Sequence, residues 1–176
     1  MRVLAGDVGG TSARLALVDV DGDRATILHR QDYSSTRYPG LAPIVQEYLA
    51  TLDQPPENAC IGVPCPIDEG ICTLANLNWV LDLGSFRRET GLKAALLIND
   101  FAALGHAIGF LQPADLVTIF EGTRVPMATM GIIGAGTGLG QGGLVWDGER
   151  YRVVASEGGH VDFAPRNEEE IALLRF

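Results

Sequence analysis

The first residues suited to chemistry form a glycine-rich turn, Gly6-Asp7-Val8-Gly9-Gly10-Thr11, between two apolar runs. Paired glycines let the backbone approach a ligand without a Cβ in the way, and successive N–H groups can form a concavity that binds anions. Thr11 adds a hydroxyl, and the carboxylate of Asp7 is placed to hold a divalent cation against the same anion. The turn predicts a phosphate site, and the alternative is a plain hairpin with a Gly-rich turn.

A second glycine cluster, Gly136-Thr137-Gly138-Leu139-Gly140, is the other candidate for holding phosphates. Gly138, Gly140 and Gly143 match the spacing of the dinucleotide-binding motif, but residues 144–146 have the pattern of a strand. That motif requires a helix at this point, whose N-terminal dipole meets the pyrophosphate. We therefore reject a dinucleotide site here.

Two polar residues, Asn99 and Asp100, stand where an apolar strand pattern ends and a helical pattern begins. Asn and Asp are preferred helix caps, which gives both residues an ordinary structural explanation. The C-terminal edge of a strand is also where open α/β sheets place ligands. Capping and ligand binding can therefore coexist at this point.

A loop bent by two glycines carries Glu157 and His160. Planar groups of this kind hold sugars and discriminate hydroxyl positions, because a missing hydroxyl leaves a polar atom unpaired. A buried histidine satisfied by a neighbour is the structural alternative. Metal ligation is disfavoured, since the spacing is not H-E-x-x-H and no cysteine is close.

Composition narrows the class of protein. The chain has 176 residues, 47% hydrophobic and 20% charged, which is typical of a globular protein. Its net charge of −9 disfavours nucleic acid as a partner. The one lysine, Lys93, lies outside both glycine clusters, so a Walker-type loop is absent. No apolar run approaches the ~20 residues that cross a membrane, and no secretory segment follows Met1. We therefore expect a cytoplasmic protein with no membrane partner.

The cysteines Cys60, Cys65 and Cys72 are odd in number, in a chain without an export signal. We therefore expect free thiols. A zinc site is disfavoured because the chain has no C-x₂-C pair and no histidine beside these residues.

Hydrophobic periodicity predicts an alternating α/β chain. Strands are expected at 3–8, 12–18, 25–32, 59–63, 71–74, 94–98, 117–120, 129–133, 143–146 and 151–154, and helices at 41–52, 86–90, 101–111 and from 168 onward. A strand, a glycine turn and a second strand occur at both 3–18 and 130–146, which indicates two related halves. We place a domain boundary near residue 110.

Four motifs occur in one order along residues 6–165: the first turn with Arg14, then 99–103, then 134–140, then 157–165. Together they closely resemble bacterial glucokinases, which belong to the actin–hexokinase–Hsp70 class of ATP-binding folds. The resemblance implies an α/β, ribonuclease H-like fold of two domains with a central cleft. Residues 1–110 would be the small domain, with the first phosphate turn and the catalytic aspartate, and 111–176 the beginning of a larger, incomplete domain.

The resemblance also implies roles for the motif residues. Asp100 would accept the proton of the glucose 6-hydroxyl as that oxygen attacks the γ-phosphate of ATP. Other hydroxyls of the sugar would bind to Asn99, Glu157 and His160, and, by rough alignment, to Asn76. The phosphates would bind to Gly6, Asp7, Val8, Gly9, Gly10 and Thr11 from one side and to Gly136, Thr137 and Gly138 from the other, with Asp7 holding Mg²⁺. The family also suggests a homodimer.

Three alternatives stay open. The protein could phosphorylate another hexose, or use polyphosphate or ADP as donor. It could bind sugar as a regulator without turnover, although such regulators carry a DNA-binding segment before the first hairpin, which here begins at residue 3, and the intact Asp100 favours catalysis. The 176-residue chain alone is expected to be inactive, since the remainder would hold the adenine pocket and another sugar-binding carboxylate.

Overall fold

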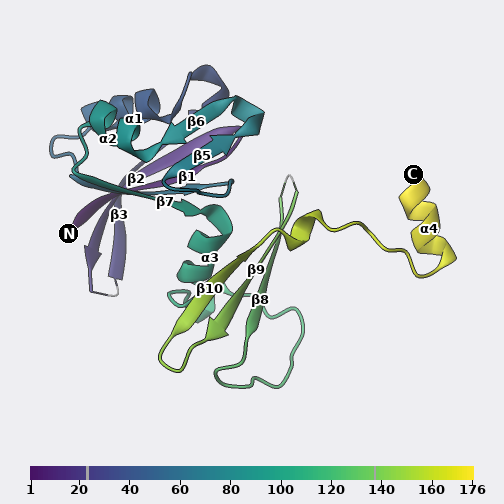
Figure 1. Ribbon diagram of the computed structural model, residues 1–176. Coiled ribbons are helices and arrows are strands. Elements are labelled where there is room, and N and C mark those ends of the chain that lie inside the picture. The colour runs from purple at the N-terminus through teal and green to yellow at the C-terminus, as the bar shows by residue number, and fades with distance from the viewer. Residues whose placement is uncertain (23, 137) are drawn as a thin grey trace. The chain divides into compact units, whose positions relative to one another are not determined.

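A five-stranded sheet organises the N-terminal part of the computed structural model (Figure 1). The structure describes residues 1–22, 24–136 and 138–176. In the order β3-β2-β1-β4-β7, the sheet contains β3 (Arg24–Ser34), β2 (Ser12–Asp21), β1 (Arg2–Val8), β4 (Asn58–Val63) and β7 (Ala94–Asn99). The first three strands pair antiparallel, whereas β1, β4 and β7 run parallel. Parallel strands end at the same edge of the sheet, and this edge carries the predicted site residues Asp7, Asn99 and Asp100.

One face of this sheet packs against two helices, α1 (Leu41–Ala50) and α2 (Leu83–Thr90) (Figure 1). Helix α1 buries residues at i, i+3, i+4 and i+7, the spacing of an amphipathic helix. The largest of these side chains is Tyr48, and the core beneath it is built from sheet residues and from Leu41, Ile44, Val45 and Phe86. Helix α2 is capped by Asp82, whose carboxylate accepts a hydrogen bond from the Ser85 amide at 2.7 Å.

A small hairpin beside the main sheet pairs β5 (Ile71–Leu74) with β6 (Trp79–Asp82). The sequence predicts β5 but not β6, because three apolar residues are too short a run to identify a strand. Trp79 is buried in the core, which supports the interpretation of this residue as a core aromatic. The turn between the strands is a short 3₁₀ helix, Ala75–Leu77, followed by Asn78 in the left-handed region at φ 53°.

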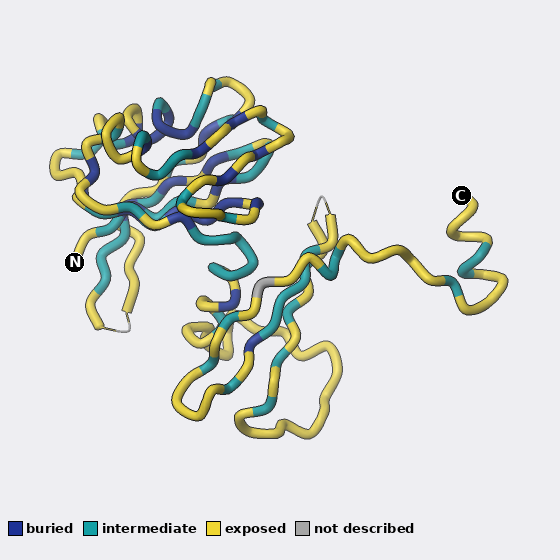
Figure 2. The backbone as a smooth tube through the Cα atoms, viewed as in Figure 1, coloured by how far each residue is buried: buried dark blue, intermediate teal, exposed yellow. Residues whose placement is uncertain are grey.

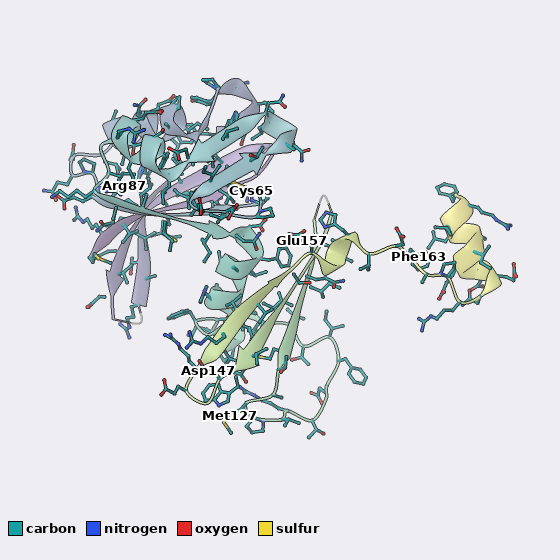
Figure 3. The ribbon with its side chains drawn as sticks, viewed as in Figure 1. Cys65, Arg87, Met127, Asp147, Glu157 and Phe163 are labelled. Carbon is teal, nitrogen blue, oxygen red and sulfur yellow. A yellow bond between two sulfur atoms is a disulfide. The ribbon has the colours of Figure 1, made fainter. Side chains whose placement is uncertain are left out.

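The expectation of free thiols is wrong for two of the three cysteines. Cys65, which follows β4 and is labelled in Figure 3, forms a disulfide with Cys72 of β5, and Cys60 stays free. The pairing depends on tertiary structure, since the two cysteines lie on different strands or their flanks. The bond ties the segment after β4 to the β5–β6 hairpin.

The chain divides into two compact units, Met1–Val117 and Thr118–Phe176. The second unit contains an antiparallel sheet, in the order β10-β9-β8, of β10 (Tyr151–Ser156), β9 (Leu139–Trp146) and β8 (Met130–Ala135), together with α4 (Glu168–Arg175). Figure 2 shows that its described residues are mostly exposed or half-buried, with Leu144 buried. The domain boundary near residue 110 stays a prediction.

The strand expected at 117–120 is wrong, because this segment has no regular structure. Its apolar side chains Val117, Ile119 and Phe120 are exposed. A β-strand needs a hydrogen-bonded partner, and a run of β-branched and aromatic residues does not supply one. The helix expected at 101–111 is α3 (Asp100–Ile108), which begins one residue earlier and ends three residues sooner.

Candidate functional site

The carboxyl edge of the parallel strands brings two of the predicted motifs together. In the sheet register, Asp7 of β1 pairs with Gly62 of β4, and Gly62 pairs with Ile98 of β7. Neighbouring strands lie about 4.8 Å apart, so Asp7 and Ile98 are separated by roughly 10 Å. The glycine turn that follows β1 and the Asn99-Asp100 pair that ends β7 therefore stand at the same edge.

Helix α3 begins at this edge and comes close to the strands at Gly62. A Cβ placed on Gly62 would lie 3.9 Å from the Cα of Asp100 and 3.5 Å from the carbonyl oxygen of Gly6. Because register partners in a parallel pair direct their side chains to the same face, Asp7 lies on the face of the sheet that α3 contacts. Asp7 and Asp100 are thus on one face at one edge.

Asn99 performs the capping role that its residue type predicts. Its Oδ1 accepts a hydrogen bond from the amide of Ala102 at 3.1 Å, as an N-cap side chain does. Asp100 is the first residue of α3 and is half-buried, and its Oδ1 accepts from the Phe101 amide at 2.8 Å. A carboxylate in the first turn is favoured by the positive end of the helix dipole. The cap uses the amide oxygen of Asn99, and the NH₂ group of the same side chain can donate to a ligand.

The first glycine turn closes the β1–β2 hairpin. Pairing between the strands ends at Val8 and Ala13, and the Gly9 amide donates to the carbonyl of Ser12 at 2.8 Å. Within the described residues, the amides of Gly10 and Thr11 have no recorded hydrogen-bond partner. These amides are the donors that an anion would meet, as the sequence predicts for a phosphate turn.

Asp7 has a charged partner that the sequence did not predict. Its Oδ2 accepts a hydrogen bond from Nη1 of Arg14 at 2.8 Å, and Arg14 also lies 3.9 Å from the carboxylate of Asp32. Among the described residues no group of three metal-binding side chains gathers. Mg²⁺ commonly takes only one or two protein carboxylates together with substrate phosphates and water, so a single carboxylate beside a phosphate turn fits its donor set.

Asn76, expected at the site only by rough alignment, lies against the first turn. A Cβ placed on Gly10 would be 3.7 Å from the Cβ and 3.9 Å from the Nδ2 of Asn76. Asn76 is exposed and sits in the 3₁₀ helix between β5 and β6. The structure therefore groups Asn76, the first turn and the carboxyl edge within the first unit.

The second glycine cluster forms the turn of the β8–β9 hairpin in the other unit. Ala135 pairs with Leu139, and the Gly136 amide donates to the carbonyl of Gly138 at 2.8 Å. Thr137 lies outside the described residues. Residues 144–146 belong to β9, which confirms that this cluster precedes a strand and not the helix of a dinucleotide-binding motif.

Glu157 is the N-cap and His160 the last residue of the short 3₁₀ helix Gly158–His160, which follows β10. The Glu157 carboxylate lies 3.1 Å from Nδ1 of His160, and the two side chains are 68% and 82% exposed. The alternative of a buried histidine is therefore wrong. Figure 3 labels Glu157 at the end of β10.

Gly159 explains why this loop can lie on the second glycine cluster. A Cβ on Gly159 would overlap the carbonyl group of Leu139, so only glycine allows the two backbones to approach so closely. The amide of Gly158 donates to Oγ of Ser156 at 2.9 Å and fixes the start of the loop. The second unit thus brings its own predicted phosphate and sugar residues side by side.

The chain is similar to glucokinases. The family model described as glucokinase matches residues 4–176. A glucokinase of Nostoc punctiforme is 46% identical over 99% of this chain and 52% of its own length. A glucokinase of Cronobacter sakazakii is 39% identical over 97% of this chain and 53% of its own. The chain spans about half the length of the curated relatives it matches.

Solved structures agree with this fold. The crystal structure of a glucokinase from an Antarctic psychrotroph superposes with a TM-score of 0.82 at 31% identity, covering 99% of this chain and 55% of that one. A glucokinase of the ROK family from Streptomyces griseus, in complex with glucose and AMPPNP, gives a TM-score of 0.64 at 23% identity, covering 94% and 52% of the two chains. The fold is therefore the α/β actin/hexokinase type that the sequence predicts.

Proposed function

The chain belongs to the glucokinase family, and from this premise we propose that the protein transfers the γ-phosphoryl group of ATP to the 6-hydroxyl of glucose. The proposal rests mainly on the arrangement of residues at the carboxyl edge of β1, β4 and β7. There, one face of the sheet holds a turn with available amides and a carboxylate at the start of a helix. Phosphoryl transfer needs positioning and charge stabilisation more than covalent chemistry, and this edge offers both.

Asp100 is the base in this proposal. Its carboxylate takes the proton of the glucose 6-hydroxyl while the hydroxyl oxygen forms a bond to the γ-phosphorus and the bond to the leaving ADP oxygen breaks. A carboxylate contributes by its position and by accepting the proton late in the transfer. Its place in the first turn of α3, with Asn99 as the cap, fixes the backbone from which it acts.

Sugar recognition is assigned to amide, carboxylate and imidazole groups. We assign the Asn99 NH₂ group and Asn76 from the first unit, and Glu157 with His160 from the second. Each of these groups can pair with a hydroxyl and leaves a polar atom unpaired when that hydroxyl is missing or inverted. The distance of 3.1 Å between the Glu157 carboxylate and Nδ1 of His160 supports their acting as one element of recognition.

The phosphates of ATP are assigned to the two glycine turns. The amides of Gly10 and Thr11 would donate from the first turn, and the backbone around Gly136 and Gly138 from the second, with Thr137 between them. Asp7 would hold Mg²⁺, which when bound neutralises charge on the phosphate oxygens. We place the reaction in the cytoplasm, where ATP is available.

The proposal is tested by identifying the product. The protein at its natural length is incubated with ATP and ¹³C-labelled glucose, and phosphorus coupling in the NMR spectrum identifies the modified oxygen. Mannose and N-acetylmannosamine serve as competing acceptors, and ADP and polyphosphate as competing donors. We expect glucose 6-phosphate, with kcat/KM for glucose about tenfold or more above the other sugars. Glucose binding without any phosphoryl transfer would contradict the proposal and favour a sugar-binding regulator.

A further inference from the structure

Ser35 is completely buried, which is unusual for serine, and it contacts the first glycine turn twice. It begins the short 3₁₀ helix Ser35–Arg37 that follows β3. Its hydroxyl donates to the carbonyl of Gly9 at 2.9 Å, and its amide donates to the carbonyl of Thr11 at 3.0 Å. One residue of a 3₁₀ helix, 26 positions along the chain from Gly9, therefore holds two of the carbonyl groups in the turn.

Because the peptide bond is planar, the hydrogen bond from Ser35 to the Gly9 carbonyl also fixes the direction of the Gly10 N–H group. In a planar trans peptide the C=O and the following N–H point in opposite directions. The Gly9 carbonyl is directed at the buried Ser35, so the N–H of Gly10 in the same peptide is directed away from the interior. The Gly9 amide is already bonded to Ser12. Gly10 thus presents its donor on the side that a ligand can reach.

Two adjacent glycines would otherwise leave this peptide free to rotate, because glycine adopts both signs of φ at little cost. A hydrogen bond from a buried side chain restricts that freedom. Preorganised donors bind an anion better than donors that must reorient, because no reorganisation is needed when the ligand arrives.

We infer that Ser35 is a positioning residue that orients the Gly9–Gly10 peptide for the phosphates of the nucleotide. The inference rests on the proposed function, in which this turn binds ATP. Ser35 itself touches no substrate and acts through the turn. The sequence did not predict it, because an isolated serine after a strand carries no motif.

The test compares Ser35→Ala with Ser34→Ala in the protein at its natural length. Ser34 is the matched control, since its hydroxyl lies 3.1 Å from that of Thr36 and its side chain has no recorded bond to the turn. AMPPNP binding is measured by titration calorimetry, together with KM for ATP and for glucose and the melting temperature. We expect Ser35→Ala to weaken AMPPNP binding about tenfold, the effect of one hydrogen bond, and to leave KM for glucose within about twofold. Ser34→Ala should match the wild type.

Nucleotide affinity separates positioning from a purely structural role. A Ser35→Ala protein with a lower melting temperature and unchanged AMPPNP affinity overturns the inference. If that variant does not fold, Ser35→Cys carries the test, because a thiol keeps the shape with a weaker donor. Its affinity should be intermediate, and wild-type affinity overturns the inference.

Binding without turnover separates this inference from the proposed function. If the wild type binds AMPPNP but phosphorylates no hexose, the proposed function fails and the effect of Ser35→Ala on binding still decides the role of Ser35. If the wild type binds no AMPPNP, the inference is overturned as well.

Discussion

The glycines of the two turns differ in their surroundings, which makes single-residue tests informative. Gly10 lies in ordinary contact distance of Asn76, whereas Cβ atoms placed on Gly136 and Gly138 meet no described atom within 4 Å. An alanine at either of the latter positions therefore costs the free protein little. A change in nucleotide binding in such a variant would therefore reflect a clash with the ligand and not a disturbance of the fold.

We predict that Gly138→Ala raises KM for ATP about tenfold or more and shifts the melting temperature little. The added methyl group would occupy space that the phosphates need for close approach to the backbone. Gly122→Ala is the control, because a Cβ there also meets no described atom within 4 Å and Gly122 lies outside the proposed site. Steady-state kinetics with unchanged KM for ATP in Gly138→Ala would remove this turn from the nucleotide site.

Tyr33 carries a buried hydroxyl with no hydrogen-bond partner among the described residues. Burial raises the pKa of Tyr33 to about 12. An unfolded chain loses this proton near its ordinary pKa of 10, so this residue's contribution to folding stability is complete below pH 10 and is lost as the pH rises toward 12.

We predict that Tyr33→Phe leaves the free energy of unfolding at pH 7 equal or raises it by up to about 1 kcal/mol, since an unpaired buried polar group is removed. The variant should also lose less stability between pH 10 and 12 than the wild type. Tyr48→Phe is the contrast, because the Tyr48 hydroxyl donates to the carbonyl of His29 at 3.1 Å and its removal should cost about 1 kcal/mol. Urea unfolding measures both, and destabilisation by Tyr33→Phe equal to that of Tyr48→Phe would show that the Tyr33 hydroxyl is satisfied.

At the level of elements, the sequence pattern predicted most strands and helices of the first unit and the β1–β2 hairpin, but not the parallel pairing of β1 with β4 and of β4 with β7. The run 41–52 gave helix α1, and the apolar runs at 59–63 and 94–98 gave two of the parallel strands. Strand β6, which begins at Trp79, shows one limit of prediction from the sequence. A strand of four residues is too short to be identified by its own pattern and is defined by its pairing with β5. The segment 117–120 shows a second limit, since its residues have high β-propensity but pair with no described strand.

The disulfide between Cys65 and Cys72 stabilises the elements next to Asn76. Its Cα atoms are 6.0 Å apart and it closes a short loop, so the chain-entropy relation gives about 2.5 kcal/mol. We predict that the free energy of unfolding falls by about this amount in the double variant Cys65→Ala/Cys72→Ala. Dithiothreitol should destabilise the wild type similarly and leave the double variant unchanged. Cys60→Ala is the control, and a wild type insensitive to reductant would contradict the pairing.

Gly159 joins the loop of Glu157 and His160 to the second glycine turn. We predict that Gly159→Ala destabilises the β8–β10 sheet by roughly 1–3 kcal/mol, because its Cβ would overlap the Leu139 carbonyl and the backbone must move. Gly158→Ala should be milder, since there the nearest atom, at 2.6 Å, is the end of the flexible Gln141 side chain. Hydrogen exchange across β9 measures the difference, and equal protection in the two variants would contradict the role of Gly159.

For the whole molecule, motif order identified the family and the fold more completely than it identified the site. The first glycine turn, the Asn99-Asp100 pair and the loop of Glu157 and His160 were singled out from residue types, and the sheet register explains why the first two meet at one edge. The ion pair of Arg14 with Asp7 and the role of Ser35 were missed, because a contact across two strands and a buried hydrogen bond to a backbone carbonyl depend on tertiary structure. Among the described residues, no helix is long and apolar enough to span a membrane.

The proposed reaction depends above all on the carboxylate at position 100. Asp100→Asn keeps the size of the side chain and removes its ability to accept the proton. In the protein at its natural length we predict that kcat for glucose 6-phosphate formation falls by about 10²–10⁴, the contribution of a general base. Glucose affinity from calorimetry should stay within about threefold, which shows that the site is intact. A variant that binds glucose normally and retains more than about a tenth of the wild-type kcat would contradict catalysis by Asp100.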